Sequence, residues 1–517
     1  VKAALDAALP GVPVSLSSRV APEMREFERA STTAANAYVQ PLLGRYLGQI
    51  ESSLATTAPH ARLFVMLSSG GLASSSVAQE VPVQLVESGP AAGALAACRY
   101  AASTGHEDLI AFDLGGTTAK MCVIADGRPA LTHETEVARR ARFKRGSGIP
   151  LLVPTVHLIE IGAGGGSIAR ADRLGLLKVG PESAGADPGP ACYGLGGDQA
   201  TVTDANLMLG YLDENAFLGG RMQLDRERAG HALELLGRRL GISGLEAARG
   251  VHDLVNENMA IATRRHVTEQ ARDPAQHVLV ALGGGGPLHA TGLARRLGIR
   301  TVICPPAAGA ASALGCLVAP ATIELARSHL ARIDTPDWER LTSLYAELEE
   351  EARAALASAG VEPSQVRIRR WADARYVGQG FEVPVEIPDA FFEKHDSRAL
   401  HRSFSDVYRA RFSRALEEVP VECTTWRLTA HGPEGRVDLA VLASRREGGR
   451  GTPGRRSVHF AEAGGFVDCL TVDRYSLAPG DRLEGPAIVQ EHESAAVVDP
   501  GSAAVVDDSW NLVITLA

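Results

Sequence analysis

Continuous apolar runs and segments of helical periodicity alternate through the chain before residue 328. Val278–Leu282 is an unbroken apolar run of the length expected for a buried strand, and Thr301–Cys304 is predicted as the next strand. Asp225–Leu240 and Leu245–Gln270 carry apolar residues at helical spacing and predict two helices. Other predicted elements are a helix from Ala21 to about Ile50 and strands at Pro13–Leu16, Ala61–Leu67 and Met121–Ile124. This alternation predicts an α/β fold.

After Ser328 the pattern changes. Trp338–Ala359 predicts a charged helix, and from Val366 onward apolar and polar residues alternate as in half-buried strands. The predicted strands are Arg367–Tyr376, Phe381–Ile387, Val419–Ala430, Ser457–Phe460, Ala487–Val489, Ala495–Val498 and Asn511–Ile514. We therefore divide the chain into residues 1–85, residues 86–327 with a Gly- and Pro-rich insertion at 146–210, and a β-rich C-terminal domain at 328–517.

Composition narrows the class of protein. The 517 residues suffice for two to four domains, and 52 basic against 61 acidic residues give a net charge of −9. Nucleic acid is not the expected partner of a chain without a basic patch, and the basic, Gly-rich stretch Arg445–Arg456 predicts a surface loop. Seven scattered cysteines, no long apolar run and no signal peptide predict a cytoplasmic protein without a membrane span.

The stretch Ile110–Lys120 carries the strongest chemical signal. A short apolar strand leads to Asp113, the pair Gly115 and Gly116 predicts a turn, and the hydroxyl residues Thr117 and Thr118 follow. Glycine backbone can approach a ligand closely, its N–H groups can cradle phosphate oxygens, and an acid at a strand end can hold Mg²⁺. The pattern thus favours a phosphate-binding β-hairpin, with an ordinary Gly turn between core strands as the alternative.

A second Gly cluster, Gly283–Gly286, follows the strand Val278–Leu282 and opens a helix. Ligands of α/β sheets lie beyond the carboxyl ends of strands, so this loop and the Asp113 hairpin can face one cleft. The pair suggests a nucleotide clamp like that of the sugar kinase, Hsp70 and actin superfamily. His289, at the start of the helix, is expected to be structural rather than to touch the ligand.

Several long motifs resemble the A subunit of the hydantoinase/oxoprolinase family, which includes N-methylhydantoinases, 5-oxoprolinases and acetone and acetophenone carboxylase subunits. The motifs span nearly the whole chain. They are Phe27–Thr33 with Asn36–Tyr38, Glu87–Gly93, Phe112–Lys120, Glu160–Ile168, Gly180–Gly194, Thr201–Asn206, Gly283–Ala290 and Gly485–Glu491.

The resemblance implies an actin-like ATPase core, ATP and Mg²⁺ as cofactors, and a hetero-oligomer with a hydantoinase B-type subunit. It also implies ATP-driven hydrolysis of a small cyclic amide substrate, such as a hydantoin or 5-oxoproline. By motif match, the phosphates and metal would be held by Asp113, Gly115, Gly116, Thr117, Thr118 and Lys120. The adenosine would be lined by Gly283, Gly284, Gly285 and Gly286. The acceptor site would be shaped by Gly164–Ser167, Glu182–Tyr193, Asp204 and Asn206.

Alternatives remain open for several residues. Asp204 suits either a ligand contact or a helix cap, and Lys120 could meet a phosphate, pair with an acid or be solvated. A metal site of Asp187 and Cys192 with a nearby histidine has no ligand spacing in its favour, and Cys192 has no identifiable base that would make it a nucleophile.

The family pattern has an earlier Asp-Gly-Gly-Thr hairpin, which would precede Val1. The chain begins as though inside a helix and without Met, so we expect a front segment to be missing. Without that segment, ATPase activity of this chain alone is in question. The alternative functions are an ATP-dependent ketone carboxylase subunit and, if the truncation is native, an inactive scaffold subunit.

Overall fold

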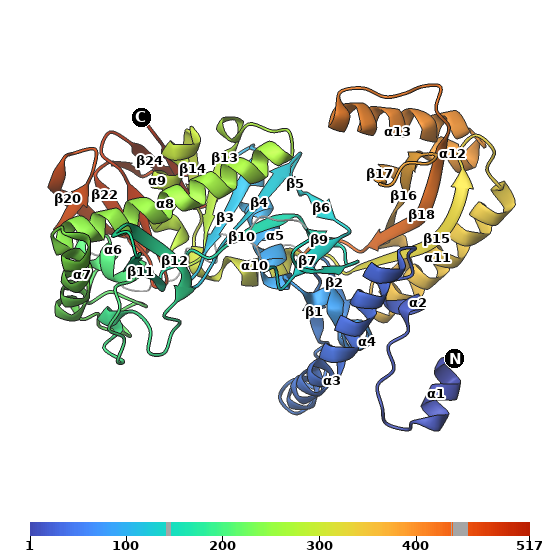
Figure 1. The fold of residues 1–517 in the computed structure, drawn as a ribbon, viewed down its shortest axis with the longest axis horizontal. Coiled ribbons are helices and arrows are strands. Elements are labelled where there is room, and N and C mark those ends of the chain that lie inside the picture. Colours follow the sequence, from blue (N-terminus) through green and yellow to red (C-terminus); the bar gives the residue numbers. More distant parts are fainter. Residues whose placement is uncertain (141–145, 436, 438–452) are drawn as a thin grey trace. The chain divides into compact units, whose positions relative to one another are not determined.

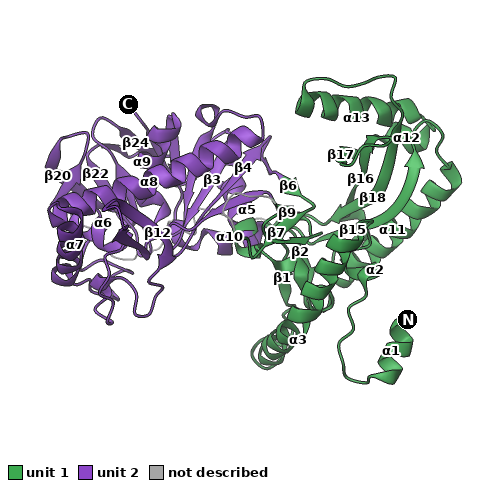
Figure 2. Ribbon diagram, in the orientation of Figure 1, with its two compact units in different colours: residues 1–91, 131–156, 319–435 green, residues 92–130, 157–318, 436–517 purple. Residues whose placement is uncertain are grey.

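The computed structural model describes residues 1–140, 146–435, 437 and 453–517. Most of the predicted basic loop Arg445–Arg456 lies outside these residues. The chain forms two compact units, each assembled from three segments (Figure 2). Unit 1 comprises Val1–Ala91, Leu131–Val156 and Ala319–Gly435, and unit 2 comprises Ala92–Ala130, His157–Val318 and Arg436–Ala517.

Unit 2 is built on a nine-stranded sheet (Figure 1). Along the sheet the strands run in the order β10 (Leu158–Ile161), β4 (Ala119–Ala125), β3 (Leu109–Leu114), β13 (Val278–Leu282), β14 (Thr301–Cys304), β25 (Leu512–Thr515), β24 (Ala503–Val506) and β21 (Arg482–Glu484), with β5 (Arg128–Pro129) paired to β4. Strand β13 is fully buried and parallel to both β3 and β14, which explains its continuous apolar sequence.

Helices and a second sheet complete unit 2. The helices α8 (Gly244–Glu269) and α9 (Gly286–Leu297) contact strands of the large sheet. The second sheet runs β19 (Gly454–Phe460), β20 (Gly465–Asp473), β22 (Ala487–Gln490) and β23 (Ala495–Val498). The remaining elements are the strand pair β11 (Ser167–Ala171) and β12 (Leu177–Ser183), the helices α5 (Ser88–Ala102, which begins in unit 1), α6 (Val202–Met208), α7 (Arg226–Leu240) and α10 (Ala311–Val318), and the short turns η2 (Ala191–Tyr193), η3 (Pro274–Gln276), η4 (Ala308–Ala310) and η6 (Arg474–Ser476).

Unit 1 contains a four-stranded antiparallel sheet. Its strands run β15 (Thr322–Arg332), β18 (Val421–His431), β16 (Arg367–Tyr376) and β17 (Val383–Glu386). One face packs on α11 (Trp338–Ser358), α12 (Asp389–Glu393) and α13 (Ser397–Phe412). Trp426, Phe391 and Phe404 are among the largest side chains buried there, so apolar contact between this face and the helices forms the core.

The remaining elements of unit 1 lie in its first two segments, apart from one short turn. The helices are α1 (Lys2–Ala8), α2 (Ser17–Val20), α3 (Glu26–Thr57), α4 (Ser75–Glu80) and the short turn η1 (Pro82–Leu85), and η5 (Pro363–Gln365) lies in the third segment. The strands form the pairs β1 (Phe64–Met66) with β2 (Leu72–Ser74), β6 (Leu131–Thr132) with β9 (Thr155–Val156), and β7 (Thr135–Val137) with β8 (Ile149–Leu151). None of the described helices is long and apolar enough to cross a membrane.

Some predicted elements differ from those observed. Pro13–Leu16 has no strand partner, and the chain turns into α2 instead, so that prediction is wrong. Between β17 and β18 the sequence folds into α12 and α13, which the alternation pattern missed. The structure also divides the residues after 328 between both units, because β25 pairs with β14 and β24 pairs with β25 in the large sheet of unit 2.

Candidate functional site

The hairpin predicted to bind phosphate is present. Its strands β3 and β4 are antiparallel, with Leu114 opposite Ala119, which leaves Gly115 to Thr118 as the turn. The N–H of Gly115 donates to the carbonyl of Thr118 at 3.1 Å and closes the turn. The strand–turn–strand arrangement inferred from sequence is therefore confirmed.

The tip of the hairpin presents backbone donors. Gly116 and Thr117 are exposed and Thr118 is partly buried. Within the described part of the chain, the N–H groups of these three residues reach no acceptor. Successive N–H groups in such a turn can form an anion-binding concavity, so the tip has the chemistry needed for a phosphate oxygen.

Asp113 lies where three elements meet. It is opposite Leu282 on the parallel strand β13, and two glycines adjoin its carboxylate. A Cβ on Gly93 of α5 would lie 3.5 Å from Oδ2, and a Cβ on Gly283 would overlap Oδ1. No described residue donates a hydrogen bond to this carboxylate; burial raises its pKa, and the charge of Lys120 lowers it. Asp113 thus has unused hydrogen-bond acceptors, and the two glycines beside it place no side chain against its carboxylate. This arrangement suits a cation or a hydrated metal.

The second Gly loop is fixed against the end of β3. Gly283 has a φ of +79°, a value that side-chain-bearing residues rarely adopt, and its N–H donates to the carbonyl of Ala308 at 2.8 Å. The N–H of Gly285 donates to the carbonyl of Leu114 at 2.9 Å. The structure therefore brings the Asp113 hairpin and the loop at the start of α9 together, as the two motifs predicted.

Lys120 pairs with an acid, which is one of the three roles left open above. Its Nζ lies 3.4 Å from a carboxylate oxygen of Glu160 and donates to Thr118 Oγ1 at 2.8 Å. Asp113, Lys120 and Glu160 are register partners on β3, β4 and β10, so the three charged side chains form one row across the sheet. The ammonium group is thus paired with Glu160 beside the hairpin tip, and its charge lowers the pKa of Asp113.

The Gly164–Ser167 loop, expected to shape an acceptor site, covers the hairpin turn. The N–H of Gly165 donates to the carbonyl of Gly115 at 3.1 Å. A Cβ on Gly164 would lie 2.6 Å from the backbone of Thr117, which explains why the loop carries glycine there. The loop therefore supports the tip from one side through backbone contacts.

Asp204, expected to be catalytic, is fully buried and completely hydrogen-bonded. Its carboxylate accepts from the N–H of Cys192 at 2.8 Å, from the N–H of Ala191 at 3.3 Å, and from the N–H and Oγ1 of Thr201 at 2.9 and 2.7 Å. Thr201 is the N-cap of α6, and Asp204 is the reciprocal third residue of a capping box. This geometry favours the helix-cap alternative over the catalytic role.

Asn206, also expected to be catalytic, is buried among other side chains. Its Oδ1 lies 2.8 Å from His252 Nδ1, and its Nδ2 lies 3.0 Å from His289 Nε2. Both ends of the amide are therefore committed to imidazoles, which favours a structural role. His289 is buried as well, in agreement with the structural role expected for it.

The described residues contain no group of three or more His, Cys, Asp or Glu side chains arranged to hold a metal ion. Cys192 is buried, and burial raises the pKa of its thiol, with the charge of Asp204 acting in the same direction. A thiolate is the reactive form of cysteine, so neither the metal hypothesis nor a nucleophilic role for Cys192 gains support.

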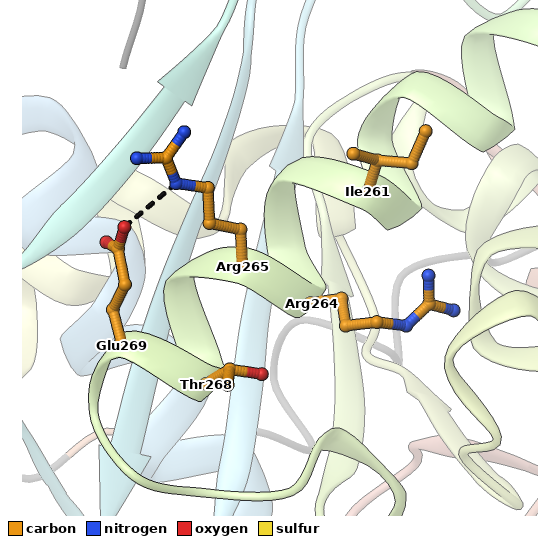
Figure 3. A pocket seen from close by; sticks show the side chains of 5 residues that line it. All are labelled: Ile261, Arg264, Arg265, Thr268 and Glu269. Atoms are coloured by element: carbon orange, nitrogen blue, oxygen red, sulfur yellow. Dashed lines mark hydrogen bonds and ion pairs between the residues drawn. The ribbon is translucent and has the colours of Figure 1, made fainter. Parts of the chain in front are cut away.

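A shallow depression on α8 holds none of the predicted site residues. It is lined by Ile261, Arg264, Arg265, Thr268 and Glu269 (Figure 3). Arg265 Nε pairs with Glu269 at 2.8 Å, while Arg264 points away from that pair. The depression lacks a convergent set of polar groups, which distinguishes it from the hairpin site.

Sequence reasoning missed two residues beside Asp113. Gly93 of α5 leaves space in front of the carboxylate, and the same Cβ position would lie 3.5 Å from Ser312 Oγ at the start of α10. The motif Glu87–Gly93 carried a signal, because small residues on the first turn of a helix permit close approach. Ser312 had none, since its proximity depends on the crossing of α5 and α10.

These features define a mixed α/β protein in which a Gly hairpin, whose tip N–H groups reach no acceptor among the described residues, lies next to a Gly-rich helix start. Comparison with known families assigns the chain to a family. The family Hydantoinase/oxoprolinase matches residues 29–325, and the Hydantoinase/oxoprolinase C-terminal domain matches residues 334–514. The chain belongs to the hydantoinase/oxoprolinase family, which confirms the resemblance drawn from its motifs.

Individual relatives cover almost the whole chain. An uncharacterized protein of Methanocaldococcus jannaschii is 38% identical over 506 residues, which are 96% of this chain and 71% of the relative. The caprolactamase subunit alpha of Pseudomonas jessenii is 32% identical over 514 residues, or 98% of this chain and 73% of the relative.

Solved structures agree with this assignment. The crystal structure of the ATP-dependent caprolactamase from Pseudomonas jessenii matches 99% of this chain and 74% of its own, with a TM-score of 0.82 and 31% identity. The nucleotide-free structure of acetone carboxylase, described for ATP-dependent acetone carboxylation, matches 100% of this chain and 73% of its own, with a TM-score of 0.77 and 25% identity. The relatives include subunits of multi-subunit enzymes and act on different substrates.

Proposed function

We propose that this chain is the nucleotide-binding subunit of an enzyme that opens a small cyclic amide at the expense of ATP, together with a hydantoinase B-type subunit. The carrying observation is the Asp113 hairpin. A carboxylate without a described hydrogen-bond donor and three N–H groups without described acceptors lie on one hairpin, beside a Gly-rich helix start. The ATP-dependent caprolactamase and acetone carboxylase among its structural relatives support ATP as the energy source.

The roles of the residues follow from their chemistry. The tip N–H groups of Gly116, Thr117 and Thr118 would bind phosphate oxygens, and Gly283–Gly286 would line the adenosine side. Asp113 would hold Mg²⁺, which neutralises phosphate charge when bound. Lys120, paired with Glu160 and opposite Asp113 in the sheet, would add positive charge beside the tip. Positioning and charge neutralisation of this kind are the main contributions of a protein to phosphoryl transfer.

The proposed reaction must activate an amide carbonyl, which is a weak electrophile. An unstrained amide carbonyl is attacked slowly by water, because its nitrogen donates electron density to the carbon. Transfer of the terminal phosphoryl group of ATP to the carbonyl oxygen gives ADP and an activated carbon. Water then adds at that carbon, and the C–N bond breaks as the ring nitrogen takes up a proton, which leaves an acyl phosphate. A second water hydrolyses the acyl phosphate to the carboxylate and free phosphate. A base for the attacking water would come from the partner subunit.

We also propose that the large sheet of unit 2 with α8 and α9 is one lobe of an actin-like ATPase core. Support comes from the antiparallel hairpin β3–β4 joined to the parallel strands β13 and β14, with a helix beginning directly after β13. In such an arrangement, loops at the carboxyl ends of β3 and β13 face the same ligand.

The test is binding of Mg·ATP by the complex with its B-type subunit, measured by calorimetry, for the wild type and Asp113→Asn. The isosteric amide removes the charge, so we expect the dissociation constant for Mg·ATP to be at least about tenfold larger. Asp126→Asn is the matched control, since Asp126 is an exposed aspartate with a φ of +51° at the other end of β4, a conformation that asparagine tolerates. That control should remain within about twofold of the wild type.

Turnover then separates the possible substrates. Release of ADP and phosphate in step with opening of hydantoin, 5-oxoproline or a lactam supports the proposal. ATP turnover that requires bicarbonate and a ketone would instead identify a carboxylase subunit. Binding of the B-type subunit without any binding of ATP would identify a scaffold and refute the nucleotide site.

A further inference from the structure

Four buried or partly buried side chains in unit 2 close a ring of hydrogen bonds. Asn206 Nδ2 lies 3.0 Å from His289 Nε2, and His289 Nδ1 lies 2.9 Å from Asn256 Oδ1. Asn256 Nδ2 lies 3.1 Å from His252 Nε2, and His252 Nδ1 lies 2.8 Å from Asn206 Oδ1. Each side chain has two partners within the ring, so the four form one closed unit.

The ring has a definite proton arrangement. Each asparagine donates through its NH₂ group and accepts through its carbonyl oxygen. Both histidines must therefore accept at Nε2 and donate from Nδ1, which is the neutral Nδ1–H tautomer. A second proton on either imidazole would place an N–H opposite an NH₂ group, two donors facing each other. In this arrangement each of the four hydrogen bonds joins one donor to one acceptor.

The surroundings favour the neutral form. Tyr211 stacks on His252 with centroids 4.8 Å apart, and His252 stacks on His289 at 4.9 Å. Burial lowers the pKa of His252 to about 4 and holds the pKa of His289 well below its ordinary value. Arg296 also lowers both pKa values, while Asp253 acts in the opposite direction on His252.

The ring joins three helices at the start of one of them. Asn206 belongs to α6, His252 and Asn256 to α8, and His289 to the first turn of α9. The N–H of His289 donates to the carbonyl of Gly285 at 3.3 Å, and no side chain caps this end of α9. The loop Gly283–Gly286 is thus held to α6 and α8 through His289.

We propose that the ring of Asn206, His252, Asn256 and His289 fixes the first turn of α9 and thereby sets the position of the Gly283–Gly286 loop for the nucleotide. The four side chains are positioning residues. The inference rests on the proposed nucleotide site and adds a device that holds it in place. Because a closed ring satisfies each polar group with another member, breaking it at one point leaves buried partners unpaired and the helix start free to shift.

The first experiment reads the ring itself. The holoenzyme is labelled with ¹⁵N-histidine, and the two imidazoles are assigned with His252→Gln and His289→Gln. We expect both in the Nδ1–H tautomer, with no titration between pH 8 and about 5, since burial lowers their pKa values. An Nε2–H tautomer, or ordinary titration of either histidine, would overturn the proposal without reference to ATP.

The second experiment reads the consequence for the nucleotide. Asn256→Leu breaks the ring with little change in volume, and we expect the KM for ATP to rise about tenfold while kcat at saturating ATP changes less than about twofold. Asn256→Asp should restore the KM, because a carboxylate can accept from His289 Nδ1 and from a protonated His252 Nε2.

Asn511→Leu is the control, since Asn511 is a fully buried and hydrogen-bonded amide of the same unit, outside the ring. Its KM should stay at the wild-type value even if stability falls. An equal rise in KM for both leucine variants would show general destabilisation and refute the positioning role. If the wild type binds no ATP, the positioning role falls with the nucleotide site, and an intact NMR signature would identify the ring as a support of the fold alone.

Discussion

Replacement of Gly283 by alanine tests whether the contact between the Gly loop and Asp113 organises the site. Gly283 follows β13 directly, has a φ of +79°, and lies against both the side chain of Asp113 and the backbone of Leu114. A Cβ there would lie 2.5 Å from the carbonyl oxygen of Leu114 and would overlap the Asp113 carboxylate. The methyl group therefore acts on the conformation of residue 283 and on the position of the acid.

The magnitude has two parts. A side chain at this φ costs about 1–2 kcal/mol, because Cβ comes too close to the backbone. Overpacking against a backbone carbonyl that belongs to the large sheet adds typically about 1–3 kcal/mol. We therefore expect Gly283→Ala to lower the free energy of unfolding of unit 2 by about 2–5 kcal/mol.

Gly175 offers a matched control for the first part. It has a φ of +75° in the turn between β11 and β12, and a Cβ added there meets no atom within 4 Å. Gly175→Ala should therefore cost only the conformational part, about 1–2 kcal/mol. The difference between the two alanine variants isolates the clash with Leu114 and Asp113.

The assay combines urea denaturation, followed by a probe in unit 2, with calorimetric titration of Mg·ATP. We expect Gly283→Ala to be the less stable variant by about 1–3 kcal/mol and to bind ATP at least about tenfold more weakly, with Gly175→Ala close to the wild type in binding. Equal stability of the two variants would refute the packing argument. Unchanged ATP binding by a folded Gly283→Ala protein would refute the role of this contact in the nucleotide site.

Two further predictions concern buried polar groups. Asp204→Ala removes the acceptor for three backbone N–H groups and one hydroxyl, so urea denaturation should show a loss of about 3–5 kcal/mol; normal stability without turnover would restore the catalytic role for Asp204. Burial lowers the pKa of His266 to about 4, so the unfolded chain binds more protons than the folded chain between pH 6.5 and 4. On acidification through this window, the free energy of unfolding of the wild type should fall by about 1.4 kcal/mol per pH unit more than that of His266→Gln. Parallel pH profiles for the two proteins would contradict that linkage.

The part of the fold that could be predicted depends on local pattern. The predicted bounds of Val278–Leu282 and Thr301–Cys304 match the observed strands, because buried strands are largely apolar and a Gly or Pro follows each of these two directly. The hairpin Ile110–Lys120 was equally accessible, since an acid, two glycines and two flanking apolar strands are contiguous in sequence. The boundaries of such elements can be read from the local sequence.

The strand pairings and side-chain roles that could not be predicted depend on residues far away in the sequence. The pairing of β25 with β14 joins residues about two hundred positions apart, and no local pattern specifies which strand a C-terminal strand meets. Asn206 looked like a substrate ligand because an amide beside an acid suits that role, whereas its partners His252 and His289 lie 46 and 83 positions away. Asp204 was ambiguous for a related reason, since its donors at Ala191 and Cys192 precede the helix that it caps.

The glycines around the hairpin share one physical function, which is to leave out a Cβ where backbone or a carboxylate must come close. Gly93 and Gly283 leave room beside Asp113, and Gly164 leaves room for the backbone of Thr117. Of these three, only Gly283 has a positive φ, so backbone flexibility does not explain the set. Close approach does explain it, because each glycine faces an atom of the hairpin from a different element. Three separate elements thus converge on one acid and one turn, and that convergence supports the proposed nucleotide site over an ordinary Gly turn between two strands.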